Sequence, residues 1–258
     1  MSVFIVAGLS ARMLAETAAD EGFDVVALDL FGDADTRRAS VDWHAIGNPS
    51  SLRIDAEMFL DALRVAAAAH ADVLGWIAGS GFEGRPDLLQ RGAQVMRRIG
   101  NDADTVARVR DPQSFFAVLE AARVPHPPVR FSAPSGKGWL LKDAHGCGGW
   151  HVRRVEAPPD RSLSAADADA PAHHYFQREV DGIPMSATFV ADGRHARVLG
   201  FNEQIVKPVG RHPFGYHGAV GPVPMQAALA ARVTAAVEAV VAAFELRGLG
   251  SLDFMLQG

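Results

Sequence analysis

Residues 138–150 read GWLLKDAHGCGGW: an apolar segment typical of a strand ends at Lys142 and runs directly into a loop with Gly146, Gly148 and Gly149. A lysine at a strand end can hold a polyphosphate by its charge, and glycines let backbone N–H groups reach phosphate oxygens. Lys142 is also one of only three lysines in the chain. The stretch points to phosphate binding, but a glycine turn between strands needs no ligand, so a plain hairpin explains the loop equally well.

The composition is that of a globular enzyme. The chain has 258 residues, of which 48% are hydrophobic and 21% charged, enough for two or three compact lobes. A net charge of -5 and a pI near 6.0 argue against a dedicated nucleic-acid binder. The single cysteine excludes an internal disulfide, and we expect no apolar run of membrane-spanning length and no export signal. We therefore expect a cytoplasmic protein without nucleic-acid or membrane partners.

The amino-terminal segments have the pattern of a βαβ unit. Residues 3–7 and 24–29 predict strands around a helix at 11–21, with Ser10 as the helix cap and Asp29 at the end of the second strand. Dinucleotide-binding folds place an acid there to hold a ribose. The turn GLSAR lacks the G-x-G-x-x-G fingerprint, however, so a purely structural turn is the better interpretation.

The alternation of strands and helices continues along the chain. Asp111 and Pro112 open an amphipathic helix, and residues 158–171, rich in Pro, Ala, Ser and Asp, predict a surface loop. The other expected elements are helices at 55–69, 86–98 and 225–244, strands at 73–78, 175–180, 185–191, 196–202 and 250–256, and a loop at 210–224.

In this order the segments resemble the ATP-grasp superfamily across nearly the whole chain. The resemblance implies an α/β fold of α+β lobes, with a Rossmann-like lobe at 1–100, a first ATP-grasp lobe at 101–180 and a second at 181–258. After the βαβ lobe it rests on four stretches: DPQSFFAVLEAARVPHPP (111–128), WLLKDAHGCGGWHVRRV (139–155), YFQREVDGIPMSATFVADG (175–193) and GLGSLDFML (248–256).

The resemblance also implies the site residues. Lys142 would contact ATP phosphates under the glycine loop, Lys207 and Arg211 would add positive charge, and Asp253 would be the first carboxylate that holds Mg²⁺. The adenine-binding hinge would be Gln177, Arg178, Glu179 and Val180, and the segment that closes on substrate would contain Arg211, His212, Tyr216, His217 and Gly218.

The chain departs from the family pattern at three places. Asp111 and Pro112 stand where many relatives have an Asp-Lys pair, which leaves Arg108 and Arg110 as alternatives for the missing phosphate lysine. Pro184 replaces an acid that binds ribose in some relatives. The sequence ends at 258, where the next strand of the family would bring a second carboxylate and an asparagine to the metal, so we expect the natural sequence to continue.

Three other features invite different chemistry. Cys147 is better explained as a small packing residue than as a nucleophile. His173 and His174 are adjacent, so in an extended strand they would point to opposite faces, which disfavours one shared metal. His212 and His217 are explained equally well by substrate contact and by a solvated loop.

The implied activity is ligation: a carboxylate attacks the γ-phosphate of ATP, and an amine then attacks the acylphosphate. The segments GIPMS and YHGAVGP look closest to a branch that includes tyramine or tyrosine glutamate ligases of methanofuran-type cofactor biosynthesis. ATP and Mg²⁺ are the implied cofactors, small carboxylates and amines the substrates, and a homodimer is one compatible assembly. Two alternatives stay open: a catalytically depleted nucleotide-binding regulatory or scaffold protein, and a dinucleotide-dependent oxidoreductase.

Overall fold

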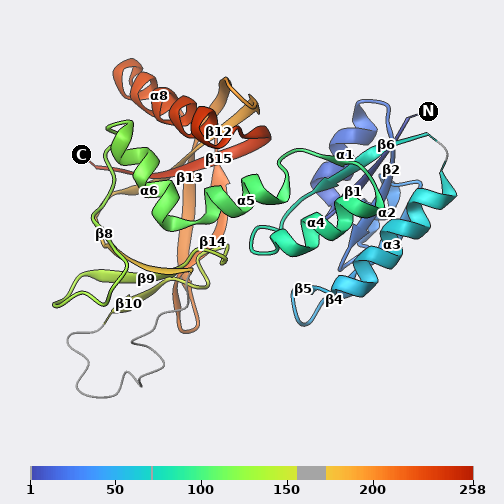
Figure 1. Ribbon diagram of the computed structural model, residues 1–258, viewed down its shortest axis with the longest axis horizontal. Helices are drawn as coiled ribbons and strands as arrows, with labels where there is room; N and C mark the ends of the chain where they lie inside the picture. The colour runs from blue at the N-terminus through green and yellow to red at the C-terminus, as the bar shows by residue number, and fades with distance from the viewer. Residues whose placement is uncertain (1, 71, 156–172, 258) are drawn as a thin grey trace. The chain divides into compact units, whose positions relative to one another are not determined.

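The computed structural model describes residues 2–70, 72–155 and 173–257 (Figure 1). The chain divides into two compact units, Met1–Val106 and Ala107–Gly258. The finer boundary that the sequence places near residue 180 stays a prediction. The surface loop expected at 158–171 lies outside the described residues.

The first unit is built on a parallel sheet with strand order β3-β2-β1-β6-β7. The expected βαβ opening is confirmed. The strands are β1 (Val3–Ala7), β2 (Asp24–Asp29), β3 (Asp42–Ala45), β6 (Val73–Ala78) and β7 (Arg98–Ile99), with a small ribbon of β4 (Gly47–Asn48) and β5 (Arg53–Ile54). The helices are α1 (Arg12–Asp20), α2 (Ala34–Arg38), α3 (Ala56–Ala69) and α4 (Pro86–Val95), and α5 (Ala103–Arg110) follows.

Both faces of this sheet are buried, because successive strand residues point to opposite sides. On β1, Ile5 belongs to the core beneath α3 and α4, whereas Val6 packs with α1. The first of these cores contains an aromatic cluster in which the ring of Phe59 lies 5.2 Å from that of Trp76 and 5.1 Å from that of Phe82. The sheet therefore needs no ligand to complete its packing.

Two sequence expectations in this unit are wrong. The helix expected at 86–98 ends at Val95, and Arg98–Ile99 pairs with β6 as the edge strand β7. Ser10 does not cap α1: the cap residue is Ala11, and its N–H donates to the carboxylate of Asp29 at 3.0 Å. Both differences arise from contacts between segments that are distant in sequence.

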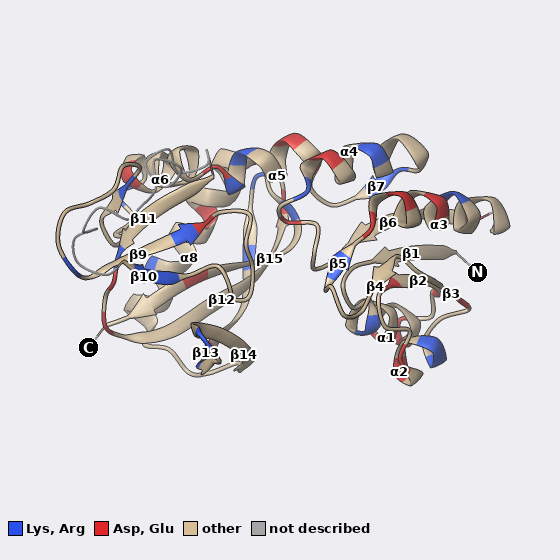
Figure 2. Ribbon diagram, turned by 90° about the horizontal axis from the view of Figure 1, so that it is seen from below, with Lys and Arg blue, Asp and Glu red and all other residues tan. Residues whose placement is uncertain are grey.

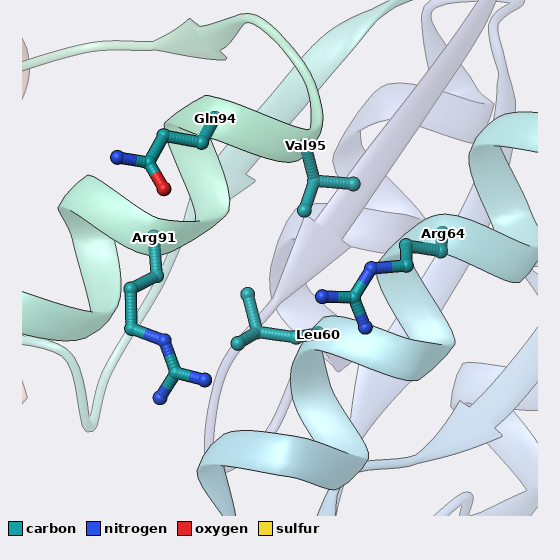
Figure 3. A pocket seen from close by; sticks show the side chains of 5 residues that line it. All are labelled: Leu60, Arg64, Arg91, Gln94 and Val95. Carbon is teal, nitrogen blue, oxygen red and sulfur yellow. The ribbon is translucent and has the colours of Figure 1, made fainter.

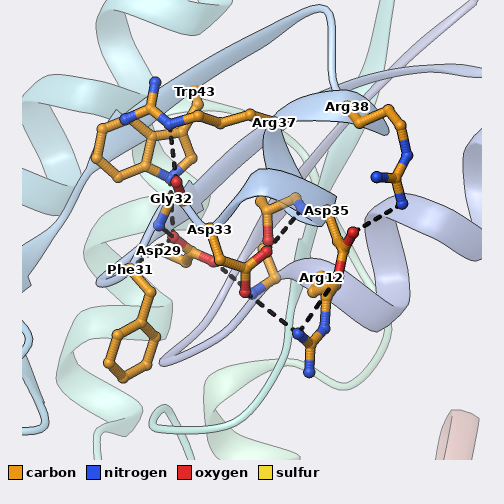
Figure 4. A network of polar contacts seen from close by, with 11 residues as sticks. Arg12, Asp29, Phe31, Gly32, Asp33, Asp35, Arg37, Arg38 and Trp43 are labelled. Carbon is orange, nitrogen blue, oxygen red and sulfur yellow. Dashed lines mark hydrogen bonds and ion pairs between the residues drawn. The ribbon is translucent and has the colours of Figure 1, made fainter.

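Asp29 is a fully buried carboxylate whose partners all come from its own unit (Figure 4). Oδ1 accepts hydrogen bonds from the N–H groups of Phe31 at 3.0 Å and Gly32 at 2.9 Å and from Nε1 of Trp43 at 2.8 Å. Oδ2 accepts the bond from Ala11. Because four N–H donors already occupy the carboxylate, the structure favours the structural interpretation of this turn over ribose binding.

The second unit contains two antiparallel sheets, with strand orders β10-β9-β11-β8 and β14-β13-β12-β15 (Figure 1). The first consists of β8 (Val129–Arg130), β9 (Trp139–Asp143), β10 (Arg153–Val155) and β11 (His174–Arg178). The second consists of β12 (Ile183–Asp192), β13 (Ala196–Val209), β14 (His212–Val220) and β15 (Arg247–Leu256), and the helices are α6 (Pro112–Ala121) and α8 (Ala227–Phe244). Asp111 and Pro112 open α6 as expected, and the carboxylate of Asp111 caps the helix by accepting the N–H of Ser114 at 2.8 Å.

Helix α8 corrects the expectation that no apolar run reaches the length of a membrane span. Among the described residues, α8 is the one helix whose length and apolar composition would suffice to cross a membrane. Its Val237 and Val241 pack with the second sheet, and its Val240 and Phe244 pack with α6. In this fold α8 therefore serves as the core helix of the second unit.

The segment 210–224, expected as a loop, contains the strand β14 instead. It pairs with β13 through two irregularities of register, and a side chain at Gly215 would meet the backbone carbonyl of Lys207. Glycine permits this close approach, so a composition typical of loops here serves strand pairing.

Candidate functional site

Lys142 and Asp253 lie at the centre of the candidate site. Lys142 on β9 donates from Nζ to Oε1 of Gln177, a diagonal neighbour on β11, at 2.7 Å. Asp253 on β15 accepts a hydrogen bond from Nε2 of Gln204 at 2.9 Å and a longer one from Oγ of Ser251 at 3.4 Å. Each charged group is thus held by neutral side chains of its own sheet.

The two charges are coupled across the sheets. Burial lowers the pKa of Lys142, and the nearby negative charge of Asp253 opposes this effect. Burial raises the pKa of Asp253, while Gln204, Ser251 and Lys142 oppose it, although the residue keeps a solvent-exposed surface. The protein therefore disfavours both charged forms when no ligand is present, and an anion beside Lys142 with a cation beside Asp253 would relieve this penalty.

The second sheet has one polar face and one apolar face. Nδ2 of Asn202 donates to Oγ1 of Thr188 at 3.0 Å, and Ser186 pairs in register with both Asn202 and Asp253. The residues between them face the helix: Ala187, Phe189, Leu252 and Phe254 pack with α8. Sequence reasoning missed Gln204, Asn202, Ser186 and Thr188, although the polar–apolar alternation along β12 and β15 was the signal that could have found them.

The glycine loop lies against β14. Gly148 and Gly149 have φ values of +65° and +77°, which favour glycine, and a Cβ on Gly149 would collide with the carbonyl oxygen of Phe214. The carbonyl of Gly148 accepts the N–H of Tyr216 at 2.9 Å, and Nδ1 of His212 lies 3.0 Å from the carbonyl of Trp150. These contacts fix the loop beside the segment that the resemblance assigns to substrate closure.

The structure separates the two arginine alternatives. Arg110 donates to the carbonyl of Gly146 in the glycine loop at 2.8 Å, and its Nε is buried without a hydrogen-bond partner among the described residues. Arg108 instead donates to the carbonyl of Phe244 at the end of α8, at 3.4 Å. Arg110 also lies near Tyr175, whose pKa burial raises to about 12 against the opposing charge of Arg110. The positive charge beside the loop therefore belongs to Arg110.

The expected hinge residues, Gln177 to Val180, lie at and just after the end of β11. Arg178 donates to the carbonyl of Lys137 at 2.8 Å, and the N–H of Glu179 donates to the carbonyl of Gly138 at 2.9 Å. The carboxylate of Glu179 is engaged by Arg154, with the shortest contact at 2.7 Å. Val180, directly after Glu179, is partly buried. Their contact with adenine stays a prediction.

Among the described residues, Lys207 and Arg211 make no contact with Lys142 or Asp253. Lys207 is exposed on β13, where strand alternation places it on the face opposite to Gln204. Arg211 is exposed in the turn between β13 and β14. Cys147 is exposed in the glycine loop. A phosphate-binding role for Lys207 or Arg211 stays a prediction.

Comparison with known proteins decides the family. The sequence model described as the ATP-grasp domain matches residues 109–258, more than half of the chain. The chain belongs to the ATP-grasp family. No curated protein matches it by sequence. The expected fold, an ATP-grasp unit with an amino-terminal parallel α/β lobe, is confirmed.

Solved structures share this ATP-grasp fold at low sequence identity. Biotin carboxylase from Campylobacter jejuni has 16% identity and a TM-score of 0.72, over 97% of this chain and 61% of that one. L-amino acid ligase from Bacillus licheniformis has 16% identity and a TM-score of 0.69, over 99% and 64%. N5-carboxyaminoimidazole ribonucleotide synthetase from Thermotoga maritima has 12% identity and a TM-score of 0.62, over 99% and 65%. The chain thus spans less than two thirds of these relatives, and the likeness shows the fold alone.

A pocket of about 420 Å³ lies in the first unit, between α3 and α4 (Figure 3). Its arginines are already paired: Arg64 contacts Asp61 at 2.6 Å, and Arg91 contacts Glu57 at 2.6 Å. Acidic and basic residues are interspersed on both units (Figure 2). This pocket contains none of the residues of the ATP-grasp unit described above; it is lined by Leu60, Arg64, Arg91, Gln94 and Val95.

Proposed function

We propose that this ATP-grasp protein is an ATP-dependent carboxylate–amine ligase that works through an acylphosphate. The observation that carries the proposal is that Lys142 and Asp253, each hydrogen-bonded within its own sheet, lie near enough for each charge to act on the pKa of the other. A lysine and a carboxylate from different sheets are coupled electrostatically, yet each is hydrogen-bonded to a glutamine. Such a pair can accept a phosphate and its metal ion together.

The donor set fits ATP and Mg²⁺. Lys142, Arg110 and the N–H groups of the glycine loop would neutralise and hold the phosphates. The carboxylate of Asp253 and the side-chain amide oxygen of Gln204 offer the oxygen ligands that Mg²⁺ prefers, with phosphate and water oxygens for the remaining positions. Bound there, Mg²⁺ would supply charge neutralisation on the phosphates. The backbone after Gln177 would hold adenine.

The chain's own residues would position the reactants. A substrate carboxylate oxygen attacks the γ-phosphorus, the bond to the β-phosphate oxygen breaks, and ADP leaves. An amine then attacks the acyl carbon, and inorganic phosphate leaves as the amide forms and the amine loses a proton. Lys142 and Arg110 would stabilise the charge on the transferred group, and the loop against β14 would exclude water from the acylphosphate.

Glutamate is the carboxylate that we propose, joined to an amine in cofactor biosynthesis. The support is the resemblance of GIPMS and YHGAVGP to tyramine and tyrosine glutamate ligases. In the structure the second segment lies in and just after β14, whose Tyr216 contacts the glycine loop. The side chains that select the substrate would then lie directly beside the phosphates of ATP.

Trapping the acylphosphate tests this function. The protein is incubated with Mg·ATP, hydroxylamine and one carboxylate at a time: glutamate, tyrosine, or bicarbonate, which tests carboxylase-type chemistry. We expect ADP release and a hydroxamate with an amino acid carboxylate and no hydroxamate when the carboxylate is omitted. Carboxylate-stimulated ADP release with bicarbonate alone would contradict the ligase assignment.

One observation favours the depleted alternative. The side chains that contact Asp253 are an amide and a hydroxyl, from Gln204 and Ser251, and neither is a second carboxylate. Nucleotide binding in calorimetry without any ADP release, across the carboxylates tested, would support a regulatory nucleotide-binding protein instead.

A further inference from the structure

Asp143, His173 and His174 form a cluster outside the proposed ATP site residues. One carboxylate oxygen and one nitrogen from each imidazole lie within 4.8 Å of one another, and all three residues are partly buried. Asp143 ends β9 and pairs in register with His174, the first residue of β11. The cluster therefore sits where two paired strands meet, directly after Lys142.

The sequence interpretation put the two histidines on opposite faces if both were extended, but their rings lie close together, with centroids 4.9 Å apart. His173 precedes β11, and its carbonyl accepts the N–H of Ala144 at 2.9 Å, which continues the pairing of β11 with β9 by one residue. Nε2 of His173 lies 3.8 Å from Oδ1 of Asp143. The two adjacent histidines can then bind the same metal ion.

The side chains of the cluster are oriented but incompletely satisfied. Oδ1 of Asp143 accepts the N–H of His145 at 2.8 Å, which fixes the carboxylate. The ring of His145 stacks on that of His173 with centroids 4.4 Å apart. Nδ1 of His174 is buried and has no hydrogen-bond partner among the described residues. A buried nitrogen without a partner is costly unless something binds it.

We propose that Asp143, His173 and His174 bind a zinc-type transition-metal ion. Two imidazoles and a carboxylate form a known zinc ligand set that leaves an open position. Zn–ligand bonds of about 2.0–2.1 Å in a tetrahedron place ligand atoms roughly 3.4 Å apart. The 3.8 Å contact needs only a small side-chain rotation to reach that spacing. Mg²⁺ prefers all-oxygen ligands, so this site differs in chemistry from the one proposed at Asp253.

A metal here would tie the end of β9 to the start of β11. Asp143 lies three residues before Gly146, where Arg110 contacts the loop. The ion would hold the first residues of the glycine loop in place without contacting the nucleotide, so this inference does not depend on the proposed ligase activity.

Calorimetry with Zn²⁺ tests the site. Untagged, chelator-treated protein is titrated with Zn²⁺ in the absence of nucleotide, and we expect one ion per chain. His173→Ala and Asp143→Asn should each weaken binding by more than the about 10–100-fold typical of removing an outer-shell partner. Asp143→Asn keeps an acceptor for the N–H of His145, so it preserves the turn. Circular dichroism of each variant verifies the fold.

A second aspartate–histidine pair provides the matched control. Asp192 and His195 lie 3.6 Å apart on an exposed turn, and no third ligand joins them among the residues that the structure describes, so His195→Ala should leave Zn²⁺ binding unchanged. The visible spectrum of bound Co²⁺ should report a tetrahedral site that His173→Ala removes. The proposal is overturned if the folded wild-type protein takes up no Zn²⁺, or if the site variants bind it as the wild type does.

Discussion

Asp29 in the first unit and Asp253 in the second are both strand acids, yet their surroundings differ. Asp29 is fully buried and accepts four N–H bonds, three of them from the backbone. Asp253 keeps a solvent-exposed surface and accepts hydrogen bonds from the side chains of Gln204 and Ser251, and the charge of Lys142 acts on its pKa. A carboxylate saturated by its own backbone supports the fold, whereas one held by exchangeable side chains is available to a ligand.

The sheets around these acids differ in the same way. The parallel sheet of the first unit is apolar on both faces, and helices cover both. The second sheet of the other unit packs one face on α8 and presents the polar residues beside Asp253 on the other. The sheet of the first unit therefore buries both of its faces and contributes to stability, whereas the second sheet of the other unit leaves a polar face available for binding.

The largest effect should come from Lys142→Ala. We expect nucleotide-dependent turnover to fall by at least about 100-fold, the size of loss when one preorganised charge-stabilising donor is removed. Calorimetry should also show much weaker ATP binding, while the melting temperature stays close to that of the wild type. Lys137→Ala is the matched control, because Lys137 is exposed and, in the described part of the chain, contacts Arg178 through its backbone carbonyl. Unchanged ATP affinity in Lys142→Ala would remove this lysine from the site.

Asp29→Ala should produce the opposite profile. Removing the carboxylate leaves buried N–H groups without an acceptor, so we expect a loss of about 3 kcal/mol in the free energy of unfolding. Urea denaturation measures this loss, and ATP affinity under native conditions should not change. Asp61→Ala, which removes an exposed ion pair with Arg64, should cost less than about 1 kcal/mol. Weakened ATP binding in a folded Asp29→Ala variant would revive the dinucleotide-type interpretation.

The smallest effect should be a gain in stability from Asp253→Asn without ligand. Burial raises the pKa of Asp253 above its ordinary 3.8, so its stabilising contribution is complete below 3.8 and is lost as the pH rises through the raised value. Asparagine does not titrate, and the melting-temperature advantage of the variant should grow towards neutral pH. Since the residue is solvent-exposed, the gain should stay below the ~2–4 °C that ~1 kcal/mol gives.

The same variant should lose the Mg²⁺-dependent part of ATP binding, which calorimetry with and without Mg²⁺ measures. A variant that is more stable but binds Mg·ATP less well indicates that the acidic side chain is retained for ligand binding at a cost in stability. A constant melting-temperature difference across pH would contradict the electrostatic coupling, and full Mg²⁺-dependent activity would make Asp253 a structural acid.

The sequence predicted most of the framework, and its errors have physical causes. The strands at 3–7, 24–29 and 73–78 have the predicted bounds, because continuous apolar runs between turns are local signals. Ser10 is the expected cap of α1, but the N–H of Ala11 at the start of this helix donates to the carboxylate of Asp29 on β2 instead. The glycines of β14 were interpreted as a loop because strand pairing with β13 leaves no local pattern.

The sequence by itself determined the central strands of the first sheet, the start of α6 at Asp111 and Pro112, and that Lys142 precedes a glycine loop, since these follow from periodicity, capping and backbone freedom within a few residues. Only the tertiary structure decided which polar groups meet. Gln204 reaches Asp253, Arg110 rather than Arg108 reaches the loop, and His173 turns toward Asp143. These encounters depend on how segments distant in sequence pack together; for a strand residue such as Gln204, a shift of one residue in register would send the side chain to the opposite face.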